Sequence, residues 1–243
     1  MIATLMIIWT LTYLTPKYID SIFVSANNLY QQGAYQEALD RYTTLSVNGI
    51  EHSALYYNIG NCYYKLGKIG KAILFYKRAK KLNPWDKDIE FNLNFARSNR
   101  IDQLKELRKP KFVELILRFI HKIGPNLSLL SASAIYFLIF IILTISLFFK
   151  KQIFRHINLV LLVALIFFIV LASVNIRRIN QREGVLLKQE GNVRSGPSPD
   201  YTLIFTVHEG MEFRILEQRE DWARILLPNG MEGWLKIEGI GEI

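Results

Sequence analysis

The chain has 243 residues, 51% of them hydrophobic, and a formal net charge of +9, a length that allows one or two ordinary domains. Lys and Arg outnumber Asp and Glu by 18 to 10 in residues 1–127 and by 6 to 0 in residues 128–182, whereas acids lead by 11 to 6 in residues 183–243. The basic excess therefore borders the most apolar part of the chain, where cations meet anionic lipid headgroups. We interpret the basic run at residues 77–81 as a solvated helix face, and no nucleic-acid partner is predicted. The single cysteine, Cys62, excludes an intramolecular disulfide and, at a packing position, is expected to be buried.

The amino terminus is apolar and uncharged from Ile2 to Leu14, like the core of a signal peptide, but no basic residue precedes it. We predict a signal peptide or signal anchor over residues 1–18, cleaved near residues 15–19 or retained. Either outcome places the following region outside the cytoplasm.

A 34-residue repeat comes next. A shift of 34 superposes Asn27 on Asn61, Tyr30 on Tyr64, Gly33 on Gly67, Ala38 on Ala72 and Tyr42 on Tyr76. The pattern predicts antiparallel helix pairs in which small residues allow close approach and glycines form the turns. The run Tyr56–Gly67, with Ala72, Tyr76, Ala79 and Pro84, resembles the tetratricopeptide family. We therefore predict all-α tetratricopeptide hairpins over residues 19–108, with Asp88–Leu107 as a long capping helix.

That resemblance implies a peptide-binding groove lined by the first helix of each pair. The corresponding positions are Phe23, Asn27, Tyr30, Tyr57, Asn61, Tyr64, Lys65, Phe91 and Phe95. Asparagines are expected to bond a peptide backbone and aromatics to supply apolar contact area, although some of these aromatics are equally expected in the core. Phe23, Asp88 and Asn92 stand where some family members have basic residues for a terminal carboxylate.

Two uncharged stretches, Leu129–Phe149 and Ile157–Ile176, each match the roughly 20 apolar residues that span a membrane. The seven-residue turn Lys150–His156 predicts a transmembrane hairpin, which keeps both flanking regions in one compartment. Asn126 and Ser128 are candidate caps of the first span. Residues 111–123 form an amphipathic pattern that predicts either an interfacial helix or one packed on its own soluble domain.

From Gly184 the sequence changes to short alternating runs separated by turns, including Asn229-Gly230, which predicts β-strands. Expected strands are 185–188, 192–194, 203–207, 211–218, 222–226 and 230–236. The segment Asn192–Pro197, then His208-Glu209-Gly210, Trp222 and Gly233-Trp234 resemble the bacterial SH3 family. We therefore predict an all-β SH3-like barrel over residues 184–243. The resemblance implies peptide or cell-wall ligands, and we expect Trp222 and Trp234 to serve packing.

The fold class is thus multidomain, and the expected function is that of a scaffold or adaptor. The four histidines are isolated from one another in sequence, so no catalytic constellation, metal or other cofactor is predicted. The order of parts resembles the BatE-type proteins of bacterial aerotolerance operons. That resemblance implies an inner-membrane protein facing the periplasm, with von Willebrand factor A-type membrane proteins as partners and an indirect link to a MoxR-type ATPase. The alternative is a wall-sensing or wall-anchoring protein that binds peptidoglycan through the barrel.

Overall fold

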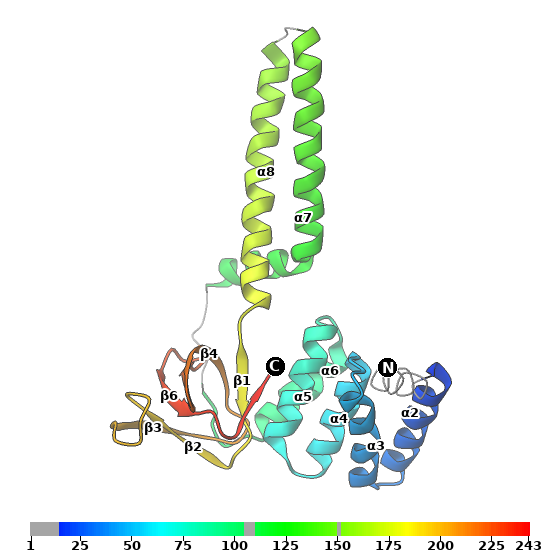
Figure 1. Cartoon of the computed structure of the whole chain (residues 1–243), viewed down its shortest axis with the longest axis vertical. Helices are drawn as coiled ribbons and strands as arrows, with labels where there is room; N and C mark the ends of the chain where they lie inside the picture. The colour runs from blue at the N-terminus through cyan, green and yellow to red at the C-terminus, as the bar shows by residue number, and fades with distance from the viewer. Residues whose placement is uncertain (1–14, 105–109, 150–151) are drawn as a thin grey trace, which may run out of the picture. The chain divides into compact units, whose positions relative to one another are not determined.

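The computed structural model describes residues 15–104, 110–149 and 152–243, so most of the predicted signal segment 1–18 lies outside the described residues. The described residues divide into two compact units. One unit contains the described residues of 1–106 and 182–243, and the other contains the described residues of 107–181. The first unit therefore joins the helical repeats to the β-barrel, although about eighty residues separate them in sequence (Figure 1).

The described part of the repeat region is made of helices α2 to α6, drawn in blue to cyan-green in Figure 1. They are α2 (Pro16–Gln31), α3 (Tyr35–Val47), α4 (Ser53–Lys65), α5 (Ile69–Leu82) and α6 (Lys87–Ser98). The turns after α2 and α4 place Gly33 and Gly67 at positive φ, 83° and 74°, which glycine adopts without strain. The repeat pattern is confirmed, because α2–α3 and α4–α5 are antiparallel pairs in the 34-residue register.

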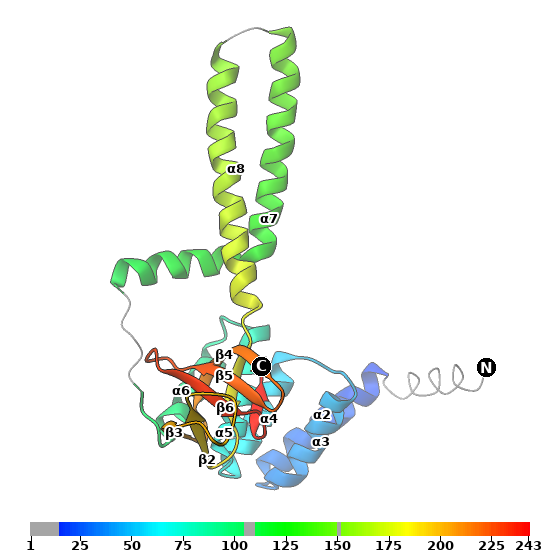
Figure 2. The same ribbon diagram turned by 60° about the vertical axis from the view of Figure 1, so that its left-hand side comes forward.

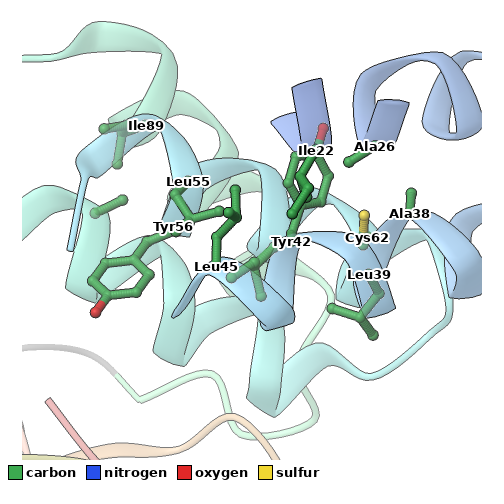
Figure 3. Packing of buried hydrophobic residues seen from close by; sticks show 12 residues of the cluster. Ile22, Ala26, Ala38, Leu39, Tyr42, Leu45, Leu55, Tyr56, Cys62 and Ile89 are labelled. Atoms are coloured by element: carbon green, nitrogen blue, oxygen red, sulfur yellow. The ribbon is translucent and has the colours of Figure 1, made fainter. Parts of the chain in front are cut away.

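The core of the repeat region lies between the helix pairs. Its buried side chains come from α2 to α6 and include Ile22, Ala26, Ala38, Leu39, Tyr42, Leu45, Leu55, Tyr56, Cys62 and Ile89 (Figure 3). Gly60 lies against the ring of Tyr76, where a Cβ would come within 2.6 Å of a ring carbon. Burial raises the pKa of the Cys62 thiol to about 12, consistent with a packed rather than a reactive thiol.

The helix predicted to run from Asp88 to Leu107 ends much earlier. α6 stops at Ser98, where the Gln103 amide donates to the carbonyl oxygens of Arg97, Ser98 and Arg100. These bonds satisfy carbonyl groups that a continuing helix would otherwise use. Asp86 caps the other end by accepting from the amides of Asp88 and Ile89.

The barrel is a seven-stranded antiparallel sheet in the order β3-β2-β6-β5-β4-β1-β7. Its strands are β1 (Glu183–Leu186), β2 (Glu190–Arg194), β3 (Leu203–His208), β4 (Glu212–Arg219), β5 (Trp222–Leu226), β6 (Glu232–Lys236) and β7 (Ile240–Glu242). The six expected strands are present with small shifts at their ends. β7 was not predicted, because three residues with a glycine in the middle, Gly241, carry too little alternating pattern.

The second unit is a pair of long helices (Figure 2). α7 (Lys111–Phe148) is broken at Gly124, with φ 66° and ψ 168°, and Pro125 opens its second part. Ser128, expected to cap the span, instead donates its hydroxyl to the carbonyl oxygen of Gly124. α8 (Gln152–Ile179) includes residues 152–156, which the sequence placed in the turn. Segments 123–148 and 152–179 are long and apolar enough to cross a membrane.

Candidate binding surfaces

The predicted groove is organised by hydrogen bonds that repeat with the sequence. In the first repeat, the Asn27 side-chain oxygen accepts from the Tyr42 hydroxyl and from the Asn58 amide. One repeat later, the Asn61 oxygen accepts from the Tyr76 hydroxyl at 2.7 Å and from the Asn92 amide at 2.9 Å. These oxygens hold neighbouring repeats together. Any contact of Asn27 or Asn61 with a peptide would therefore have to use the side-chain NH₂ group.

Several of the predicted aromatic residues also pack within the fold. Phe23 meets Tyr42 edge-on at 5.5 Å between ring centroids, and Tyr57 lies 6.0 Å from Tyr76. Tyr30 lies 5.2 Å from Tyr35, and burial raises the pKa of Tyr30 to about 12. The predicted groove residues Phe23, Tyr30 and Tyr57 are half-buried, so each has only part of its surface available to a ligand.

The exposed part of the predicted site is an aromatic strip on α6. Phe91 and Phe95 are 69% and 51% exposed, and their parallel rings stack at 6.3 Å. Tyr64 of α4 lies 5.4 Å from Phe95, and its hydroxyl accepts from the Asn99 amide. Lys65, which follows Tyr64 in sequence, is exposed, and its ammonium lies 6.0 Å from the centroid of the Tyr35 ring. We call Tyr64, Phe91 and Phe95 the aromatic strip; helix packing leaves the two phenylalanines exposed and Tyr64 half-buried beside them.

A buried carboxylate joins the repeats to the barrel. Glu212, at the start of β4, has an 8% exposed side chain and accepts two hydrogen bonds of 2.7 Å from the Arg97 guanidinium. Lys77 lies 3.1 Å and Arg100 3.1 Å from the same carboxylate. Burial alone would raise the pKa of Glu212, but the Arg97 hydrogen bonds and the charges of Lys77 and Arg97 lower it to about 2. Glu212 is therefore ionised throughout the neutral range.

Two further contacts fix the β3–β4 turn against the helices. The Gly70 amide, at the start of α5, donates to the Glu209 carboxylate at 2.8 Å. Asp102 accepts from the His208 backbone amide at 2.6 Å and lies 2.9 Å from the His208 ring nitrogen. Since Val185 of β1 also joins the apolar cluster of α5 and α6, apolar and ionic contacts act together at this junction.

The barrel has a depression of its own, with a volume of about 280 Å³. Trp222 lines it together with polar side chains and with charged side chains of both signs. The lining residues are Leu186, Glu190, Gly191, Asn192, Arg194, Pro199, Trp222, Leu235, Lys236 and Glu238. Trp222 and Trp234 are each only 8% exposed, which agrees with the packing role expected for them. Mixed charges around an indole suit a ligand that carries both amino and carboxylate groups.

Sequence reasoning missed the junction residues Glu212, Arg97 and Arg100. Their contacts join positions more than a hundred residues apart, so no local pattern identifies them. Asn92 could have been found, because it stands 34 residues after Asn58 and makes the equivalent bond. Among the described residues, no group of three His, Cys, Asp or Glu side chains is arranged to hold a metal ion.

Comparison with known proteins identifies both modules. Residues 53–86 match the tetratricopeptide repeat family and residues 189–236 match the bacterial SH3 domain family. The chain combines a tetratricopeptide repeat, a bacterial SH3 domain and two long apolar helices. Such modules suggest protein or cell-wall binding. Neither match covers half of the chain, so they identify parts rather than a whole-chain family.

Individual proteins match over limited lengths. A 55-residue segment is 40% identical to the provisionally assigned N-acetylmuramoyl-L-alanine amidase YrvJ of Bacillus subtilis (strain 168), covering 23% of this chain and 11% of YrvJ. Among solved structures, the Yersinia enterocolitica type III secretion translocator chaperone SycD is 21% identical with a TM-score of 0.34, over 35% of this chain and 64% of SycD. SycD in complex with a peptide of the translocator YopD is 15% identical with a TM-score of 0.33, over 65% and 96%.

Proposed function

We propose that the protein is a membrane-anchored scaffold without catalytic activity, which binds protein partners through its repeat groove and its barrel. The observation that carries the proposal is the junction at Glu212, because it makes one body of two modules whose families bind other molecules. A partner held at the groove would be kept at a fixed distance from a ligand on the barrel. Fixed spacing of this kind is what an assembly factor requires.

The anchor in this proposal is the α7–α8 hairpin, with segments 123–148 and 152–179 crossing the membrane. Supporting this, the Asn175 amide donates to the backbone carbonyls of Leu171 and Ile120, which removes the cost of a polar group between the two helices. Residues 111–123 present exposed Phe112, Leu115, Ile116 and Phe119, which fits a helix lying in the interface. Both binding modules would then face the periplasm of a bacterial inner membrane.

The finer assignment follows from the order of parts. BatE-type proteins of aerotolerance operons share that order, so we propose a stress-related membrane complex as the setting. Its expected partners are membrane proteins with von Willebrand factor A-type domains, and through them a MoxR-type ATPase. The aromatic strip suits an apolar segment of such a partner better than a charged one, because its side chains are aromatic and exposed.

The test is capture of partners by the full-length protein purified from membranes after crosslinking. Replacing Phe91 and Phe95 by Ser should strongly reduce recovery of the von Willebrand factor A-type proteins, while the fold is retained because both side chains are exposed. Trp85→Ser, which removes a 64% exposed aromatic of the repeat region outside the predicted groove residues, is the matched control. Equal recovery from the Phe91/Phe95 variant and the wild-type protein would contradict the assignment of the groove.

A wall-binding function is the second candidate, favoured by the depression beside Trp222. A segment of this chain is similar to YrvJ, which is provisionally named as an N-acetylmuramoyl-L-alanine amidase. The amide bond in that name, between N-acetylmuramic acid and L-alanine, is a bond of peptidoglycan. Peptidoglycan stem peptides carry amino and carboxylate groups, which the charges of Glu190 and Lys236 could pair with.

This alternative predicts that the detergent-solubilised chain sediments with purified peptidoglycan. The double variant Glu190→Ala, Lys236→Ala should lose most of that sedimentation, whereas Lys87→Ala, an exposed lysine of the repeats, should not. If neither the wild-type chain nor the control sediments, the barrel is not a wall-binding module.

A further inference from the structure

One side of α6 faces α4, and Asn92 marks that side. The Asn92 amide donates to the Tyr57 hydroxyl at 2.8 Å and to the Asn61 side-chain oxygen at 2.9 Å, and both acceptors belong to α4. Residues four positions apart lie one above the other on a helix, so Asp88 lies on the same side, one turn before Asn92. Lys87, five positions before Asn92, is rotated from that side by about 140°. Asp88 therefore lies beside the predicted groove, and Lys87 does not.

The Asp88 carboxylate is exposed and has no cation partner among the described residues. The backbone amide of Asp88 donates to the Asp86 side chain, while the other acid of the first turn, Glu90, pairs with Lys80 at 3.3 Å. On α4 the equivalent position in the 34-residue register is Ala54, whose short side chain is exposed. The described side chains of the groove thus leave the charge of Asp88 open to a ligand.

Aromatic rings accompany this carboxylate. Phe91 and Phe95 follow Asp88 by three and seven positions, which places all three on neighbouring parts of one helix face. The two phenylalanines are 69% and 51% exposed, and the half-buried Tyr57 contributes from α4. A carboxylate beside exposed rings attracts a cation twice, through an ion pair and through contact of the cation with a ring face.

We propose that the groove selects an apolar partner segment that carries an Arg or a Lys, whose charged group binds Asp88 while Phe91 and Phe95 contact its apolar residues. The proposal rests on the groove binding proposed above and specifies the chemistry of the bound segment. Charge complementarity decides for this occupant, because Asp88 would repel an acidic segment or a terminal carboxylate.

The test is selection of peptides from a random library displayed on phage, with the detergent-solubilised full-length chain as the immobilised target. We expect the wild-type protein to recover peptides enriched in Arg or Lys next to apolar residues. Enrichment is measured relative to the Phe91→Ser, Phe95→Ser variant, which accounts for peptides that bind the detergent or the barrel. Asp88→Asn should recover apolar peptides without the basic preference.

Glu37→Gln is the matched control for Asp88→Asn. Glu37 is also an exposed acid in the first turn of a helix, α3, and lies outside the predicted groove residues, so its variant should keep the basic preference. For one recovered peptide, replacing the basic residue by Gln should weaken binding to the wild-type protein about three- to fivefold. The same replacement should leave binding to Asp88→Asn unchanged, a coupling that a purely structural role of Asp88 would not produce.

A basic preference that persists in Asp88→Asn would overturn the inference and leave the groove assignment intact. Recovery of apolar peptides without any basic preference by the wild-type protein would do the same. If the wild-type protein recovers nothing beyond the Phe91→Ser, Phe95→Ser variant, the groove binds no peptide, and the inference fails together with the groove binding on which it rests.

Discussion

At the scale of single residues, Glu212 is the buried charge at the junction of the two binding modules. Removing a carboxylate from water is costly, and that cost is offset only where several donors surround the charge. Here Lys77 of α5, Arg97 of α6 and Arg100 just after α6 all converge on it. The junction is therefore specific: another barrel surface would leave these cations without a buried acid.

The pKa of Glu212 predicts a dependence of stability on acid. The folded value of about 2 lies below the ordinary 4.5, so the unfolded chain takes up the proton more readily as the pH falls. The stabilising contribution, on the order of 3 kcal/mol, is present above pH 4.5 and is lost as the pH falls toward 2. Glu212→Gln should remove a similar amount at neutral pH and flatten this acid dependence in urea unfolding.

Glu238→Gln is the matched control for that experiment. Its pair with Lys188 is solvent-exposed, so the free energy of unfolding and its acid dependence should stay near those of the wild-type protein. An acid dependence that persists unchanged in Glu212→Gln would mean that other carboxylates stabilise the junction.

At the scale of elements, the sequence predicted the helices and turns that depend on contacts between residues close together in sequence. The 34-residue period located Tyr42, Tyr76 and the turns at Gly33 and Gly67, because each repeat makes the same local contacts. Gly60 shows why the second repeat matches its family so closely: its missing Cβ makes room for the Tyr76 ring. Asn229-Gly230 likewise marked the β5–β6 turn, where Gly230 has φ 89°.

Element boundaries that depend on distant contacts were predicted poorly. α6 ends at Ser98, and beyond the local bonds of Gln103 the residues around this end, Arg97, Arg100 and Asp102, contact barrel residues more than a hundred positions further along the chain. The oxygens of Asn27 and Asn61 bond to side chains of their own and the next repeat, a role that the sequence did not predict, and their contact with a peptide stays a prediction. Phe91 and Phe95 are exposed on α6, and their role in binding a partner stays a prediction.

For the molecule as a whole, the barrel takes the position that another helix of the repeat would fill. In the 34-residue register the second helix of a third repeat would begin near Gln103, but residues 99–104 are not helical. β1 and β7 pack on α5 instead, and Val185 joins the cluster of Ala72, Ile73 and Leu93. A repeat array needs a cap that covers its last apolar face, and the barrel supplies that cover here.

If the barrel is the cap, then separating it should destabilise both modules. Gly70→Ala tests this, because the new Cβ would lie 2.7 Å from the Leu186 carbonyl oxygen and 2.8 Å from the Glu209 side chain. Alanine favours the helix by about 1 kcal/mol over glycine, so α5 itself is not weakened. We expect faster hydrogen exchange in β1, α5 and residues 99–104, measured by mass spectrometry on the full-length protein.

Lys68→Ala, at an exposed position next to the same helix start, should exchange like the wild type. Faster exchange confined to the barrel, with α5 unchanged, would show that the repeats are stable without their cover.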